Sequence, residues 1–195
     1  NRLKAVDAEE LALGSPFDYE NAALMYLVND IPEPTDVDGH QRALNAGLVS
    51  LCRETGGRAL VLFTSYAQLQ RTAEAITPPL ARDDIVVFEQ GSGPSPHTLL
   101  KNFKETDQAV LLGTRAFWEG IDIPGPDLSV LVIAKLPFDV PSDPIVSARS
   151  ESFQDPFSEF MLPEAILDFR QGFGRLIRSK QDRGGVGLID SRGFA

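Results

Sequence analysis

Five short runs of apolar residues, separated by stretches with helical character, restrict the fold of this chain more than any other feature. The runs are continuous and do not alternate apolar with polar residues, which is typical of parallel strands covered on both faces. The expected strands span residues 59–63, 85–88, 109–112, 129–134 and 186–189. The sequence therefore predicts an α/β fold with a mainly parallel, wound sheet between two layers of helices.

Four helices are expected between and after these strands, at residues 41–55, 65–76, 97–105 and 163–179. The first ends at Gly56-Gly57, a natural C-terminal stop, and the second ends before Pro78-Pro79. The segment from Pro137 to Pro156 is rich in Pro, Ser and Asp, and we expect a loop there.

The bulk properties of the 195-residue chain fit one globular domain, with 43% hydrophobic and 24% charged residues. No apolar window approaches the roughly 18 residues of a membrane span, and no signal peptide is recognisable. We therefore expect a cytoplasmic protein without membrane contact. Because residue 1 is Asn and not Met, we also expect a fragment of a longer protein.

Three residues that often carry chemistry are expected to be structural here. Cys52 is the only cysteine, so it can form no internal disulfide, and we expect it to be buried on a helix. His40 and His97 have no partner at metal-ligand spacing and are expected at the surface or at helix starts. No metal site is predicted.

The net charge of −10 argues against strong nucleic-acid binding by this chain alone, but the charge is unevenly distributed. Residues 1–40 hold nine acidic residues against Arg2 and Lys4, and we expect a solvated acidic surface there. From Asp168 onward, six basic residues face three aspartates. The basic tail is the more informative part of the chain.

The expected helix over residues 163–179 brings three polar side chains to one face. At 100° per residue, Gln171, Arg175 and Arg178 lie together. The opposite face carries an apolar stripe that we expect to face the core: Leu162, Ile166, Phe169, Phe173 and Leu176. Gly172 and Gly174 each cost about 1 kcal/mol relative to Ala, which suits a backbone that something approaches closely. The alternative is an ordinary amphipathic helix with solvated arginines.

Residues 171–178, Q-G-F-G-R-L-I-R, resemble motif VI of superfamily 2 helicases, with the pattern Q-x-x-G-R-x-x-R. The resemblance implies that Arg175 and Arg178 are catalytic and reach the triphosphate of ATP bound to a first motor domain. It also places Gln171 at the ATP site. A guanidinium fork is suited to this role, because it neutralises charge that develops on the transferred phosphoryl group.

Residues 113–125, G-T-R-A-F-W-E-G-I-D-I-P-G, resemble motif V in the form used by the DinG and XPD branch. The resemblance implies ATP-site positions at Glu119, Gly120 and Asp122. It implies DNA contacts from four residues, namely Gly113, Thr114, Arg115 and Trp118. A strand end followed by Gly and Thr offers backbone N–H groups and a hydroxyl to a phosphate. Phe117 and Trp118 are candidates either for stacking on a base or for the core, and an ordinary strand–loop is the plain alternative.

Residues 61–66, V-L-F-T-S-Y, resemble motif IV, which implies that Thr64 and Ser65 contact the DNA backbone. A helix N-terminus with adjacent hydroxyls suits an anion. The alternative is that Ser65 only caps the helix, and one residue can do both.

Two further stretches, at residues 15–19 and 135–144, extend the resemblance from about Ser15 to Asp190. It implies a RecA-like three-layer fold, with one C-terminal motor domain over residues 1–195. We expect an acidic segment over residues 1–40 and the RecA-like core over residues 41–195.

The sequence has no G-x-x-x-x-G-K-[ST] phosphate loop and no Asp-Glu-x-His magnesium-binding strand end. We therefore expect the full-length protein to use ATP and Mg²⁺, with neither bound by this domain alone. The isolated chain is expected to hydrolyse ATP negligibly. An iron–sulfur cluster, if the full-length protein has one, belongs outside this chain.

The resemblance implies the second half of an ATP-dependent 5′-to-3′ DNA helicase with a role in DNA repair at the bacterial nucleoid. Its partners are then the first motor domain of the same polypeptide and single-stranded DNA. Two alternatives remain open: a non-catalytic RecA-like module that binds nucleic acid or protein, and a scaffold domain of a DinG-like nuclease. Residues preceding Asn1 would discriminate among the three.

Overall fold

One six-stranded sheet forms the centre of the molecule. The structure is a computed structural model, and it describes residues 18–28, 30–114, 117, 123, 128–173, 176–177 and 182–190. Every strand pair is parallel, and the order is β1-β6-β5-β2-β4-β3. The strands are β1 (Ala23–Leu27), β2 (Ala59–Leu62), β3 (Val86–Glu89), β4 (Ala109–Gly113), β5 (Val130–Ile133) and β6 (Gly184–Leu188). The predicted parallel α/β sheet is confirmed.

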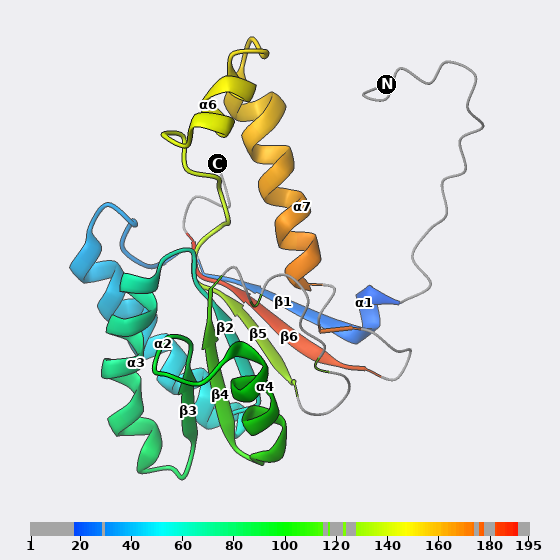
Figure 1. Ribbon diagram of the computed structural model, residues 1–195. Coiled ribbons are helices and arrows are strands. Elements are labelled where there is room, and N and C mark those ends of the chain that lie inside the picture. The colour runs from blue at the N-terminus through cyan, green and yellow to red at the C-terminus, as the bar shows by residue number, and fades with distance from the viewer. Residues whose placement is uncertain are drawn as a thin grey trace.

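Helices cover both faces of this sheet and give three layers (Figure 1). They are α1 (Tyr19–Ala22), α2 (Val37–Thr55), α3 (Tyr66–Ala81), α4 (Pro96–Glu105), α6 (Pro144–Ser150), the π-helical turn η2 (Phe157–Met161) and α7 (Leu162–Phe173). Helices α2 and α3 pack on one face, whereas α4 packs on the other. None of the helices in the described ranges combines the length and apolar character of a membrane span.

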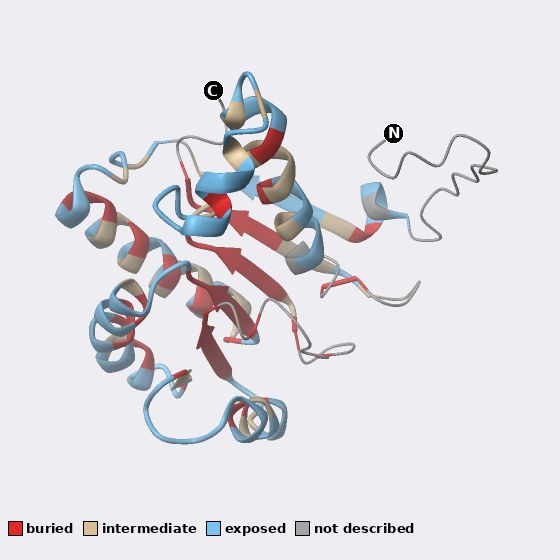
Figure 2. Ribbon diagram, turned by 45° about the horizontal axis from the view of Figure 1, so that its top comes forward, coloured by how far each residue is buried: buried red, intermediate tan, exposed pale blue. Residues whose placement is uncertain are grey.

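The central strands owe their position to their continuous apolar sequences. Every residue of β2, β4 and β5 is buried, as the red strands of Figure 2 show. Successive side chains point to opposite faces, so Leu60 and Leu62 enter one apolar cluster while Val61 enters the other. Burial of each such side chain stabilises the fold by about 1.5–3 kcal/mol.

Strand β1 lies at the edge of the sheet beside β6 and was not predicted. Its sequence is apolar, but Leu24 and Tyr26 are 73% and 65% exposed. It lies within residues 1–40, where the acidic composition predicts only a solvated surface. The apolar pentapeptide is as long as other predicted strands, but the acidic residues around it favoured a solvated segment.

Helix α6 lies in the segment 137–156, for which a loop was predicted, so that prediction was wrong. Asp143 caps α6, and its Oδ1 accepts hydrogen bonds from the backbone N–H groups of Ile145 at 2.8 Å and Val146 at 3.3 Å. Pro144 occupies the first turn, where a missing N–H costs nothing. Asp followed by Pro is therefore a helix start here.

Helix α3 continues through Pro78 and Pro79 to Ala81, beyond the predicted end before the prolines. Both prolines lie near the end of the helix. Ile76 and Leu80 are completely buried against the sheet. The burial of Leu80 offsets the backbone hydrogen bonds that the prolines cannot form.

The last helix is shorter than predicted, because α7 ends at Phe173 and neither Leu176 nor Ile177 is helical. Both of these side chains are buried in the core. A Cβ atom placed on Gly184 would lie 2.6 Å from Leu176 Cδ1, so this leucine packs directly on β6. The core contact of Leu176 therefore replaces the helical position that was predicted for it.

The predicted apolar stripe of this helix is only partly correct. Phe169 packs against the core and Leu176 is buried, but Ile166 is 43% exposed and Ala165 is buried in its place. The predicted alignment of residues 171, 175 and 178 assumed a helix that runs through residues 176 and 177, and these two residues are not helical.

Cys52 is buried on α2, as predicted, and burial raises its pKa to about 12. His40 lies in the first turn of α2, consistent with a helix start, but it is only 2% exposed. His97 lies at the start of α4 and is exposed, as predicted.

Candidate functional site

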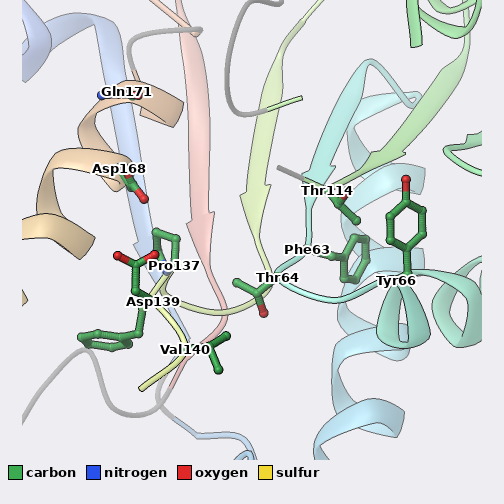
Figure 3. A pocket seen from close by; sticks show the side chains of 10 residues that line it. Phe63, Thr64, Tyr66, Thr114, Pro137, Asp139, Val140, Asp168 and Gln171 are labelled. Carbon is green, nitrogen blue, oxygen red and sulfur yellow. The ribbon is translucent and has the colours of Figure 1, made fainter. Parts of the chain in front are cut away.

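The carboxyl ends of all strands meet at one edge of the sheet, where open α/β sheets bind ligands. A cavity of about 300 Å³ opens at this edge. Its lining residues are Phe63, Thr64, Tyr66, Thr114, Pro137, Phe138, Asp139, Val140, Asp168 and Gln171. Tyr66, Phe63 and Thr114 lie on one side of it and Pro137, Asp139 and Asp168 on the other (Figure 3). The fold thus brings together Thr64, Thr114 and Gln171, which come from three separate sequence motifs.

Gln90, which follows β3, connects two of these motifs through its side-chain amide. Its Nε2 donates to Tyr66 Oη at 2.6 Å. Its Oε1 accepts from the backbone N–H of Thr114 at 2.7 Å and from Thr114 Oγ1 at 2.9 Å. Gln90 is 8% exposed and Thr114 is 7% exposed. These three hydrogen bonds hold the end of β4 to the start of α3.

The same geometry restricts what Thr114 can donate to a ligand. We expected its backbone N–H and hydroxyl to be available for a phosphate, but both donate to Gln90 in this conformation. The preceding Gly113 is the last residue of β4, and a Cβ there would lie 2.7 Å from the ring of Phe117. Phe117 is completely buried and is therefore a core residue, which removes it as a base-stacking candidate.

Thr64 and Ser65 lie at the junction of β2 and α3, and both are exposed. Ser65 caps α3, since its Oγ accepts a hydrogen bond from the backbone N–H of Gln68 at 3.2 Å. The predicted cap is confirmed. A contact between these residues and a phosphate stays a prediction.

A second cavity, of about 200 Å³, lies at the N-terminus of α3 and shares Thr64 with the first. Its wall includes the cationic side chains of Arg71 and Lys135, together with Ser65 and Gln68. A helix N-terminus carries a partial positive charge. This cavity therefore combines three features that favour an anion: the helix N-terminus, the hydroxyl of Ser65 and the two cationic side chains.

Gln171 lies in the last turn of α7, is exposed, and lines the first cavity together with Asp168. Helix α7 descends toward the sheet from the arm formed by α6 and η2 (Figure 1). Seven further predicted site residues lie outside the described residues: Arg115, Trp118, Glu119, Gly120, Asp122, Arg175 and Arg178.

Sequence reasoning missed Gln90 and the hydrogen bond of Tyr66. The available signal was a polar residue next to a glycine at the carboxyl end of an apolar strand: Gln90 precedes Gly91, and Thr114 follows Gly113. In the described part of the chain, no group of three or more His, Cys, Asp or Glu side chains could hold a metal ion.

The fold and this cavity define a three-layer α/β domain with a candidate ligand site at the carboxyl edge of a parallel sheet. The sequence profile of the helicase C-terminal domain matches residues 48–194, and the chain belongs to that family.

Two relatives illustrate the match. The chain is 38% identical over 98% of its length to the "ATP-dependent DNA helicase YoaA" of Escherichia coli, and it covers 30% of that protein. It is 35% identical over 93% of its length to the "3'-5' exonuclease DinG" of Bacillus subtilis, and it covers 20% of that protein. The chain thus spans a third or less of the length of these relatives.

Solved structures confirm the fold. An XPD helicase superposes with a TM-score of 0.70 and 19% identity, over 89% of this chain and 32% of the other. The second domain of the DEAD-box helicase Mss116p, bound to an RNA duplex, superposes with a TM-score of 0.51 and 13% identity, over 86% of this chain and 54% of the other. At such identities the likeness concerns the fold alone.

Proposed function

We propose that this chain is the C-terminal motor domain of an ATP-dependent DNA helicase that moves 5′ to 3′ on single-stranded DNA. The observation that carries the proposal is the meeting of three motif positions, Thr64, Thr114 and Gln171, around one cavity at the carboxyl edge. Membership of the helicase C-terminal domain family supports it. The full-length protein would act on DNA in the cytoplasm, at the nucleoid.

The ATP half-site of this proposal consists of Gln171, Arg175 and Arg178, together with Glu119, Gly120 and Asp122. Gln171 is exposed at the end of α7, so it is available to a partner domain. The two arginines follow within seven positions and would stabilise negative charge on the transferred phosphoryl group. Mg²⁺ and the phosphates would be held by the first motor domain, because the sequence of this chain has neither a G-x-x-x-x-G-K-[ST] phosphate loop nor an Asp-Glu-x-His strand end.

The first motor domain would dock on the exposed side of α7. Ile166 and Leu167 are 43% and 47% exposed there, on the same helix as Gln171. Apolar side chains on a helix surface favour contact with another protein surface. Such a contact places the ATP of the first domain opposite this half-site.

The DNA backbone would bind at the second cavity, with a phosphate at the N-terminus of α3 near Thr64 and Ser65. Arg71 and Lys135 in the cavity wall supply positive charge to an otherwise acidic domain. Gly113, Thr114, Arg115 and Trp118 would contact the same strand from the neighbouring motif. Because Thr114 already donates to Gln90, its part would be to position its neighbours, unless those hydrogen bonds open.

The test uses the full-length protein that contains this chain and two DNA duplexes, one with a 5′ single-stranded tail and one with a 3′ tail. We expect ATP-dependent strand separation of the 5′-tailed duplex only. Separation of the 3′-tailed duplex alone would contradict the polarity. Absence of strand separation, despite DNA-stimulated ATP hydrolysis, would contradict the helicase assignment and leave a translocase.

A nuclease scaffold is the second candidate, because the relative from Bacillus subtilis is named an exonuclease. This chain covers 20% of that relative, so the cutting residues would lie elsewhere in the polypeptide. End-labelled single-stranded DNA distinguishes the two functions. Release of terminal nucleotides without ATP would support the nuclease, and intact DNA would support the helicase.

A further inference from the structure

Tyr66 presents an aromatic ring at the mouth of the carboxyl-edge cavity. It is the first residue of α3 and follows Ser65 directly. The residue is 47% exposed although it lines the cavity, so part of the ring is open to a ligand. Exposed aromatic rings beside a backbone-binding groove are the usual platforms for bases of single-stranded nucleic acid.

The ring is held in one orientation before any ligand arrives. Its Oη accepts a hydrogen bond from Gln90 Nε2 at 2.6 Å. Gly91, with φ of +102°, lies beneath it, and a Cβ there would be 3.3 Å from Tyr66 Cε1. Gln90 is itself fixed by Thr114. A ring fixed in this way loses little conformational entropy when a planar ligand stacks on it.

The rest of the cavity suits a base better than a phosphate. Phe138 contributes apolar surface, and it is held by stacking on Phe157 at a centroid distance of 5.7 Å. Asp139 and Asp168 also line the wall, and carboxylates repel a phosphate. The cationic cavity lies on the other side of Thr64, so phosphate and base surfaces are adjacent.

We propose that this cavity is a nucleobase site, in which one base of the bound single strand stacks on Tyr66 while the adjoining phosphate lies at the N-terminus of α3. The proposal rests on the DNA-binding function proposed above and specifies how one nucleotide is held. The stacked base is read by its face, so the site accepts every base and rejects an abasic sugar. Gln90 is a positioning residue that acts through the Tyr66 hydroxyl.

The test measures the binding of single-stranded DNA to the full-length protein, with one 2-aminopurine as a fluorescent base at successive positions. We expect quenching by stacking at one register of the strand. Tyr66→Ala should abolish the quenching and weaken binding by about 5- to 150-fold, the range that alanine substitution of a stacking residue gives. Tyr66→Phe is the matched variant, and it should keep the quenching because it keeps the ring.

An abasic nucleotide at the quenched register separates stacking from a structural effect. In the wild-type protein the abasic strand should bind more weakly, whereas in Tyr66→Ala the abasic and normal strands should bind equally. Wild-type binding without a quenched register, or an equal abasic penalty in both proteins, would overturn the base site but leave the proposed DNA function intact. Failure of the wild-type protein to bind any single-stranded DNA would overturn both.

Discussion

Gln90 shows how one buried amide can connect positions that are far apart in the sequence. It lies 24 residues from Tyr66 on one side and 24 residues from Thr114 on the other. The amide has one donor group directed to the first and one acceptor directed to the second, so both ends of the side chain are used. A buried group that loses such a partner costs about 1–3 kcal/mol.

Substitution Gln90→Ala should therefore lower the free energy of unfolding by about 2–3 kcal/mol, because it removes three hydrogen bonds and leaves the buried N–H of Thr114 without this acceptor. Urea denaturation measures the change. Gln70→Ala, at an exposed position on α3, is the matched control and should change stability by no more than about 0.5 kcal/mol. Equal effects of the two substitutions would show that the amide network contributes nothing.

Cys52 gives the fold a pH dependence on the alkaline side. Burial raises its pKa from the ordinary value of 9.0 to about 12, so the unfolded chain releases this proton at lower pH than the folded chain. The contribution of the protonated thiol to the free energy of unfolding is fully present below pH 9. It falls by about 1.4 kcal/mol per pH unit between the two pKa values.

Urea denaturation between pH 8 and about pH 10.5 should show this loss in the wild-type protein and not in Cys52→Ala. Other groups titrate equally in both proteins, so the difference in slope isolates the thiol. Parallel stability curves would mean that the thiol is accessible and ionises in the folded state.

At the scale of elements, the turn between α2 and β2 requires a glycine, and a substitution there tests the backbone geometry. Gly57 has φ of +78°, and a Cβ there would lie 2.7 Å from the backbone nitrogen of Ala109. Gly57→Ala should therefore destabilise the domain by about 2–4 kcal/mol in urea denaturation. Gly47, in the middle of α2, has nothing within 4 Å of a built Cβ. Gly47→Ala should stabilise the helix by about 0.5–1 kcal/mol, and the same sign for both substitutions would contradict this geometry.

The three central strands, which the sequence predicted correctly, share one physical property. Strands β2, β4 and β5 are buried on both faces, and burial imposes a continuous apolar run that is visible in one dimension. Strand β1 is also a continuous apolar run, but it was not predicted because it lies in a segment whose composition is dominated by acidic residues. Helix α7 was predicted too long, because the burial of Leu176 and Ile177 depends on packing against β6.

The candidate site likewise contains residues that the sequence predicts and contacts that it does not predict. Thr64, Thr114 and Gln171 follow from motifs, since each belongs to a short contiguous pattern. The contacts of Gln90 depend on the order of the strands, which places β3 beside β4 and β4 beside β2. Pairings of this kind are long-range, so no local pattern contains them.

At the scale of the whole molecule, we propose that the chain contains one side of an ATP site. In this proposal the ATP site is divided between this chain and the first motor domain. The family match and the absence of a phosphate loop from the sequence together support this division. The purified chain alone should therefore hydrolyse ATP no faster than a control that lacks Arg175 and Arg178, with or without single-stranded DNA. Phosphate-release assays measure this rate, and clear DNA-stimulated hydrolysis by the isolated chain would refute the division.

The most direct test of the central claim compares ATP binding and ATP hydrolysis in the full-length protein carrying Arg175→Ala or Arg178→Ala. Arg170→Ala, at an exposed position of α7, is the control. The arginines are proposed to act on the transition state, so each substitution should lower kcat by about 10³- to 10⁵-fold while the affinity for a fluorescent ATP analogue stays nearly unchanged. DNA-stimulated hydrolysis at the rate of the Arg170→Ala control would contradict the claim that this domain completes the ATP site.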